Sequence, residues 1–144
     1  MRTAIVFTLS SLLIACSATP EQFSPLSQQD LQHHHWVLES INGQTLQLSN
    51  ELVVPTLEIG EHFTANGFNG CNRYFGQAEL KGAQFRVDKL ASTKMSCPAR
   101  LQQLEMTINQ VLGHWSRIEL SPKKRLTLTN GSNRLDFALR DWVY

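Results

Sequence analysis

Two cysteines, each beside a strong signal of local structure, constrain the fold of this chain most. Cys71 lies in residues 67–72, Gly-Phe-Asn-Gly-Cys-Asn, and Cys97 follows 26 positions later at the start of a helical pattern. Gly67 and Gly70 permit positive φ angles and close backbone approaches, and Asn72 tolerates the left-handed conformation. The segment is therefore predicted to be a tight turn at the end of a strand.

A bond between Cys71 and Cys97 would restrict the unfolded chain and stabilise the fold by about 3 to 4 kcal/mol in the entropic description. Free, buried thiols that pack as small apolar groups are the alternative. The compartment of the protein decides between a disulfide and free thiols, because disulfides persist in oxidising compartments. Arg73, directly after the turn, is either a surface charge or a contact for an anion.

The first residues have the layout of a secretory signal, with Arg2, an apolar run over residues 4–14 and then small side chains. The run is shorter than the roughly 20 residues that span a bilayer. Residues 13–16, Leu-Ile-Ala-Cys, resemble the lipobox of bacterial lipoproteins. This resemblance implies cleavage after residue 15 and lipid on Cys16. An ordinary signal peptide with a chance cysteine is the alternative.

A lipidated Cys16 predicts stable attachment to a membrane, because several acyl chains anchor a protein where one binds marginally. Ser17 after the cysteine favours the outer membrane under the sorting rule of enteric lipoproteins, with the protein facing the periplasm. Export favours the Cys71–Cys97 disulfide over free thiols. We assign residues 1–15 to a signal peptide, 16–32 to a lipidated, flexible tether and 33–144 to one folded domain.

Removal of Arg2 with the signal peptide leaves 12 of the 13 basic side chains, against 12 acidic ones. The mature chain is thus formally neutral, with no basic patch to hold a nucleic-acid backbone and no polybasic run to reinforce the anchor. No nucleic-acid partner is predicted.

Alternating apolar and polar residues predict an antiparallel sheet. Residues 36–41 and 45–48 flank Asn42-Gly43, a pair favoured in two-residue hairpin turns. Further strands are predicted at residues 56–59, 62–66, 74–75, 77–81, 84–88, 117–120, 126–129 and 134–139. So many short strands indicate a strongly curled sheet.

A single helix is predicted from Cys97-Pro98, because proline suits the first helical position. The apolar stripe of this helix comprises Leu101, Leu104, Ile108, Val111 and Leu112, opposite Arg100, Gln103 and Asn109. The stripe must pack on the sheet, so the fold class is α+β.

No motif in the chain indicates catalysis or a cofactor. A nucleophile elbow, a zinc-protease motif, a phosphate loop and a Cys-x-x-Cys pair are all missing from the sequence. His33, His34 and His35 are adjacent, but only the first and third share a face of a strand, and no nearby Cys or acidic residue completes a metal site. We predict that the protein is not an enzyme and has no metal or cofactor.

Four segments in this order resemble the META domain family. They are Trp36-x-Leu38-x-x-Ile41-x-Gly43, Gly70-Cys71-Asn72, Thr93-x-Met95-x-Cys97 and Leu126-x-Leu128. The resemblance covers residues 31–139 and implies an antiparallel half-barrel packed on one long α-helix. It also implies a link to heat stress and, for one lipoprotein of the family, to tolerance of the antibiotic novobiocin. It brings no catalytic residues.

Two functions are compatible with these features. The first is a binding or assembly factor that contacts an envelope protein, for which an exposed apolar patch that includes Trp142 and Tyr144 is expected. The second is a carrier of an apolar ligand, a lipid or a drug, with a deep apolar pocket. A protease or lysozyme inhibitor that presents residues 67–72 as a rigid loop is a third alternative.

The disulfide can be tested by mass. We expect residues 17–144, exported to a bacterial periplasm and purified without reductant, to weigh two hydrogens less than the reduced chain. The Cys71→Ser variant should lose this difference. Native mass spectrometry provides the measurement, and a wild-type chain at the full reduced mass would contradict the bond.

Overall fold

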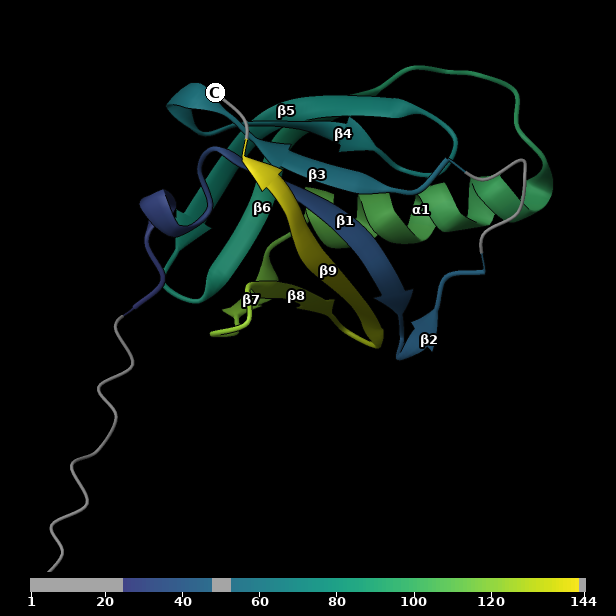
Figure 1. Cartoon of the computed structure of the whole chain (residues 1–144). Helices are drawn as coiled ribbons and strands as arrows, with labels where there is room; N and C mark the ends of the chain where they lie inside the picture. Colours follow the sequence, from purple (N-terminus) through teal and green to yellow (C-terminus); the bar gives the residue numbers. More distant parts are fainter. Residues whose placement is uncertain (1–24, 48–52, 143–144) are drawn as a thin grey trace, which may run out of the picture.

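The first and last strands of the described residues pair with each other, and this pairing closes the sheet into a barrel (Figure 1). The computed structural model of the chain describes residues 25–47 and 53–142. β1 (His34–Ile41) is antiparallel to β3 (Thr56–Ile59) on one edge and to β9 (Asn133–Trp142) on the other. The ring continues from β3 through β4 (Thr64–Phe68), β5 (Arg73–Lys81), β6 (Gln84–Ser92), β7 (Ser116–Leu120) and β8 (Arg125–Asn130) to β9.

The predicted half-barrel is therefore wrong, because eight antiparallel strands form a closed ring. The β1–β9 ladder joins Trp36 to Leu139 and Leu38 to Phe137, with two irregularities that bend the strands. The antiparallel, curled character of the sheet is confirmed. Closure depends on a contact between the two ends of the domain, which no local sequence pattern specifies.

The local turns follow the sequence closely. Asn42 and Gly43 have φ angles of 52° and 78°, as a type I′ hairpin requires, and they join β1 to β2 (Gln44–Thr45). The predicted strand at residues 62–66 begins later, because Glu61–Phe63 form the short 3₁₀ helix η2. Residues 74–75 and 77–81 belong to one strand, β5, with an irregularity between Phe75 and Gln77.

The α-helix covers the place where the barrel is weakest. β6 and β7 pair only through Gln84–Arg117 and Phe85–Ser116. α1 (Ala99–Gly113) connects these two strands and packs on β6, β8 and β9. Its buried side chains, which belong to the predicted stripe, are Leu101, Ile108, Val111 and Leu112.

The helix is shorter than the one long helix that the family resemblance implied. It has 15 residues, a length of about 22 Å at 1.5 Å per residue. It begins after Pro98, whose carbonyl accepts a hydrogen bond from the Leu101 amide at 2.9 Å. Among the described residues no helix has the length and apolar character needed to cross a bilayer.

Large side chains fill the interior of the barrel. Trp36, Tyr74, Phe85 and Phe137 are each at most 1% exposed. They pack with aliphatic side chains from the strands and from α1 in a single cluster. Trp115, in contrast, is only half-buried, and the guanidinium of Arg86 lies 4.7 Å from the centre of its ring.

The folded domain begins before residue 33. Gln28–Asp30 form the 3₁₀ helix η1, in which the Asp30 carboxylate accepts hydrogen bonds from the Ser27 amide at 2.8 Å and the Ser27 hydroxyl at 2.6 Å. Leu31 is fully buried in the core. The tether predicted for residues 16–32 is thus ordered in its last part. Tyr144 and the side chain of Trp142 lie outside the described parts of the chain.

His34 gives the fold a dependence on pH. Its ring is 2% exposed and stacks on Trp36 at a centroid distance of 5.4 Å. Burial holds the pKa of His34 below its ordinary value, so the folded protein disfavours the charged imidazole. Below about pH 6.5 the unfolded chain binds this proton more readily, and the free energy of unfolding falls as the pH falls.

We therefore expect the His34→Gln variant to lose less stability than the wild type between pH 7.5 and pH 5.5. Urea unfolding at both pH values measures the difference. His114→Gln, which alters an exposed histidine, should keep the wild-type dependence. Identical pH dependence in wild type and His34→Gln would rule out this role.

Candidate functional site

The turn between β4 and β5 is joined to the start of α1 by a disulfide. Cys71 and Cys97 form this bond with their Cα atoms 6.1 Å apart, within the range that disulfides span. Cys71 is buried, and Cys97 lies one residue before the N-cap of the helix, Pro98. The bond therefore ties one rim of the barrel to the helix that covers its weak side.

Gly67, near the end of β4, and Gly70, in the turn, are both required by close contacts. A Cβ on Gly67 would collide with the Thr56 carbonyl oxygen and lie 2.7 Å from the Tyr74 hydroxyl. This hydroxyl donates a hydrogen bond of 2.7 Å to the same carbonyl, directly beside the glycine. Gly70 has a φ of +95°, and a Cβ there would lie 2.5 Å from Leu104 of α1. Both positions therefore need glycine.

Asn69 shapes the turn from within. Its side-chain oxygen accepts hydrogen bonds from the amides of Asn72 at 2.7 Å and Cys71 at 3.3 Å. Its side-chain nitrogen donates to Asn109 at 3.1 Å and to Glu105 at 3.4 Å, both on α1. The fully buried side chain of Asn69 thus accepts the hydrogen bonds of backbone amides in the turn and connects the turn to the helix.

Asn72 joins three segments of the chain. Its side-chain oxygen accepts hydrogen bonds of 2.8 Å from the Thr93 hydroxyl and from the Met95 amide. Its side-chain nitrogen donates to Glu105 at 3.0 Å and contacts the Cys71 sulfur at 3.2 Å. The turn, the segment that leads to Cys97 and the helix therefore meet at one side chain that is 3% exposed.

We call Asn69, Asn72, Thr93, Glu105 and Asn109 the asparagine cluster. Its side-chain amides and carboxylate bond to one another or to the backbone of the turn. Groups that are satisfied in this way hold a structure together and are not offered to a substrate. The cluster holds the fold at the disulfide, and its Thr93 hydroxyl and Glu105 carboxylate both bond to the Asn72 side chain.

The sequence identified only part of this arrangement. Gly70 and Asn72 lie in the turn, and Gly67 lies just before it in β4. The exposed side chain of Arg73 takes no part in the cluster, and only its backbone bonds to Thr93, through the amide and the carbonyl. Glu105 was missed. Asn109 was expected on the exposed face, but it is half-buried. Their spacing of four residues beside the apolar stripe is the signal that could have found them.

The three histidines are separated by the backbone. His33 has a φ of 60°, His34 enters the core and His35 follows in β1. Within residues 25–47 and 53–142, no three His, Cys, Asp or Glu side chains gather closely enough to hold a metal ion.

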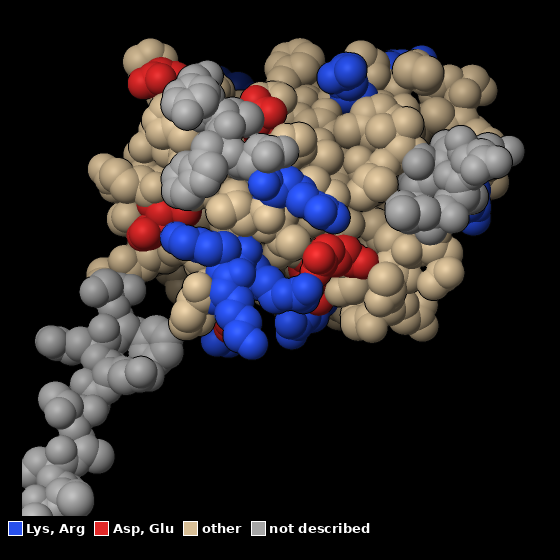
Figure 2. All heavy atoms as spheres, viewed as in Figure 1, with Lys and Arg blue, Asp and Glu red and all other residues tan. Residues whose placement is uncertain are grey.

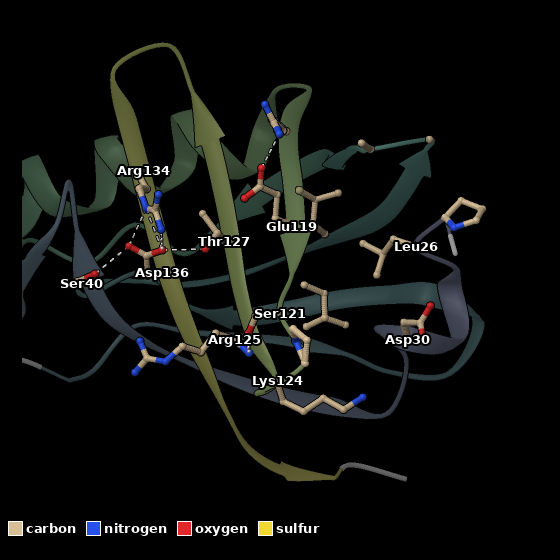
Figure 3. A pocket seen from close by; sticks show the side chains of 17 residues that line it. Leu26, Asp30, Ser40, Glu119, Ser121, Lys124, Arg125, Thr127, Arg134 and Asp136 are labelled. Carbon is tan, nitrogen blue, oxygen red and sulfur yellow. Dashed lines mark hydrogen bonds and ion pairs between the residues drawn. The ribbon is translucent and has the colours of Figure 1, made fainter. Parts of the chain in front are cut away.

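A wide groove lies on the outer surface of the barrel, where the first described residues approach β7, β8 and β9 (Figure 3). Its volume is about 1230 Å³. Leu26 and Asp30 line one side, and Lys124, Arg125 and Asp136 line the other. The groove is open and is lined by both polar and apolar groups, in contrast to the filled interior of the barrel.

Asp136 organises the floor of this groove. It accepts hydrogen bonds from Thr127 at 2.8 Å, from Ser40 at 3.0 Å and from Arg134 at 2.8 to 3.0 Å (Figure 3). Burial alone would raise the pKa of Asp136, but these donors outweigh burial and hold its pKa below the ordinary value. The carboxylate therefore stays ionised and joins β1, β8 and β9.

A closed eight-stranded barrel with one short covering helix and a disulfide-bonded turn defines a small, mostly β class of protein. A family model described as META domain matches residues 29–142, and the chain belongs to this family. The resemblance predicted from four sequence segments is thus confirmed.

Individual proteins agree with this assignment. The chain is 30% identical over 142 residues to "Heat shock protein HslJ" of Escherichia coli (strain K12), with 98% of both chains covered. It is 31% identical to a protein solved by NMR, with a TM-score of 0.69 over 81% of this chain and 97% of the other. A protein from Burkholderia xenovorans, also solved by NMR, shares the fold at 23% identity, a TM-score of 0.65 and coverage of 92% and 99%. The chain is a META-domain protein related to a heat shock protein.

Replacement of Asn72 tests the structural role of the cluster. We expect Asn72→Ala to lower the free energy of unfolding by about 2 to 3 kcal/mol, because buried partners lose their hydrogen bonds. Asn66→Ala, which removes an exposed asparagine bonded to Glu58 at 3.4 Å, should change it by less than about 0.5 kcal/mol. Urea denaturation measures both free energies of unfolding. A loss for Asn72→Ala as small as that for Asn66→Ala would show that the cluster adds no stability.

Proposed function

We propose that this protein is an outer-membrane lipoprotein that faces the periplasm and acts, without catalysis, as a binding or assembly factor in the response of the envelope to heat stress. In this proposal residues 1–15 are removed, Cys16 carries the lipid, and the folded domain contacts an envelope protein. Tolerance of novobiocin is a further expected consequence of this role. The relation to a heat shock protein over nearly the whole chain supports the link to stress.

The filled interior of the barrel is the observation that carries the binding role. Core positions are occupied by large side chains, and the polar groups of the asparagine cluster bond to one another. What the described part of the chain offers to another molecule is therefore its outer surface. Phe75, Met95 and Met106 are 61%, 64% and 64% exposed there. These large, exposed apolar side chains are the candidate contacts for a protein partner.

The two alternative functions have less support. A carrier of a lipid or an apolar drug needs a deep apolar cavity, whereas the barrel holds Trp36, Tyr74 and Phe137 in its interior. An inhibitor needs a protruding rigid loop, whereas Asn69, Gly70 and Asn72 of the turn are buried. The binding role requires neither feature.

The proposal predicts that function depends on the anchor. A strain that lacks the gene should grow less well at high temperature and in novobiocin, and the wild-type gene should restore growth. The Cys16→Ser variant should restore it poorly, because the protein leaves the membrane. Plating efficiency measures growth, and fractionation with metabolic labelling by a fatty-acid analogue measures the anchor. Full rescue by an unlabelled, soluble Cys16→Ser protein would show that function does not require attachment to the membrane.

The partner can be sought with photo-crosslinking amino acids placed at Phe75 and Met95. Crosslinks from these exposed positions to one envelope protein, absent from an equally exposed control position at Gln102, would support the binding role. Uniform crosslinking from all three positions would argue against a defined interface.

A further inference from the structure

The charges of residues 16–144, which sum to zero, are segregated between residues 16–115 and residues 116–142. Residues 116–142, which form β7, β8 and β9, contain six Lys or Arg and three Asp or Glu, a net charge of +3. Residues 16–115 contain six and nine, a net charge of −3. Figure 2 shows Lys and Arg side chains gathered where Figure 1 places β7, β8 and β9. Neutral composition therefore conceals a basic surface.

Half of the cations in this region have no ion-pair partner among the described residues. Arg117 pairs with Glu119, Arg134 with Asp136 and Arg125 with Glu39. Lys123, Lys124 and Arg140 form no such pair in the described part of the chain, and all three are exposed. We call these three residues the basic rim.

The basic rim lies at one end of the barrel. Lys123 and Lys124 belong to the turn that joins β7 to β8, where the Leu139 amide donates a hydrogen bond of 3.2 Å to the Lys124 carbonyl. Arg140 is the next residue along β9. It lies between Leu139 and Asp141, at an irregularity in the β1–β9 ladder, and it is exposed.

The first described residues lie beside this rim. Pro25, Leu26 and Asp30 line the same groove as Lys124 and Arg125 (Figure 3). Only nine positions separate Cys16 from Pro25, so an extended chain between them spans at most about 30 Å. A lipid on Cys16 would hold this end of the barrel close to the membrane. Interactions between exposed charges fade over about 8 Å at physiological salt, so the cations nearest the tether matter most.

We propose that the basic rim, Lys123, Lys124 and Arg140, docks the domain on the anionic phospholipid headgroups of the membrane that carries its anchor. This inference rests on the proposed lipidation of Cys16. Each cation near an anionic surface strengthens binding by about fivefold. The rim thus supplies a second, electrostatic attachment that orients the barrel, with β7, β8 and β9 toward the lipid and the disulfide-bonded turn toward the periplasm.

The registers support this orientation. β3 runs from Thr56, which lies opposite Phe68 beside the turn, to Ile59, which lies opposite His34 at the start of β1. The disulfide-bonded turn and the start of β1 are therefore at opposite ends of the barrel. The exposed Phe75 follows the turn in β5, and the exposed Met95 lies two residues before Cys97.

The test uses residues 16–144, with Cys71 and Cys97 oxidised and the Cys16 thiol alkylated by one tetradecyl chain, because a single chain gives marginal, reversible binding that is easily measured. Partitioning is compared on vesicles of phosphatidylcholine alone and with 30% phosphatidylglycerol. We expect at least tenfold stronger binding to the anionic vesicles, which 0.5 M salt should abolish.

Two triple variants distinguish the effect of the basic rim on membrane binding from the effect of net charge. Lys123→Gln, Lys124→Gln, Arg140→Gln should lose at least tenfold in binding to anionic vesicles and nothing on neutral ones. Arg73→Gln, Lys89→Asn, Lys94→Gln removes the same charge elsewhere, with asparagine suited to the φ of 50° at Lys89, and should lose less than threefold. Circular dichroism checks that both variants are folded.

Equal losses in the two triple variants, or equal wild-type binding to both kinds of vesicle, would overturn the docking surface. These outcomes do not depend on how the cell processes Cys16, because the alkyl chain is attached chemically. The proposed lipidation is tested separately. An unmodified Cys16 in protein recovered from cells would contradict it.

Discussion

The structure depends on keeping α1 over the gap between β6 and β7. Two residue pairs alone connect these strands, and the apolar interior would be open to water there without the helix. Asn72 secures the helix through Glu105, Asn69 secures it through Asn109, and the disulfide fixes its start. A covalent bond and buried hydrogen bonds act on the same junction, because an unsatisfied polar group at this site would be costly.

This junction gives the distinctive residues of the sequence a structural role. Gly67 and Gly70 let Tyr74, Thr56 and Leu104 approach the backbone. Each polar side chain of the asparagine cluster has a partner within the fold. The family motif therefore specifies architecture, and the outer surface carries the exposed apolar side chains and the cations.

Local sequence patterns predicted the strands and the helix well. The pairing of residues far apart in the sequence could not be predicted from such patterns. Asn42-Gly43, the alternation in β1 and the apolar stripe of α1 each depend on neighbouring residues, so the hairpin and the helix face follow from the sequence. The β1–β9 ladder joins the two ends of the domain and converted the expected half-barrel into a closed ring. Asn109 was misplaced for a related reason, since its partner Asn69 lies 40 residues away and polar side chains are expected in water. The basic surface was missed because net charge sums over residues that the fold separates.

Closure of the barrel has a topological consequence. His34 at the start of β1 lies opposite Trp142 at the end of β9, while the turns at Asn42-Gly43 and Gly131 lie at the other end of the same strands. The two ends of the domain are therefore neighbours in space. A circular permutant that links them and opens the chain at either glycine turn would keep all the ladders of the ring, so the order in which the strands are synthesised is not inherent to this architecture.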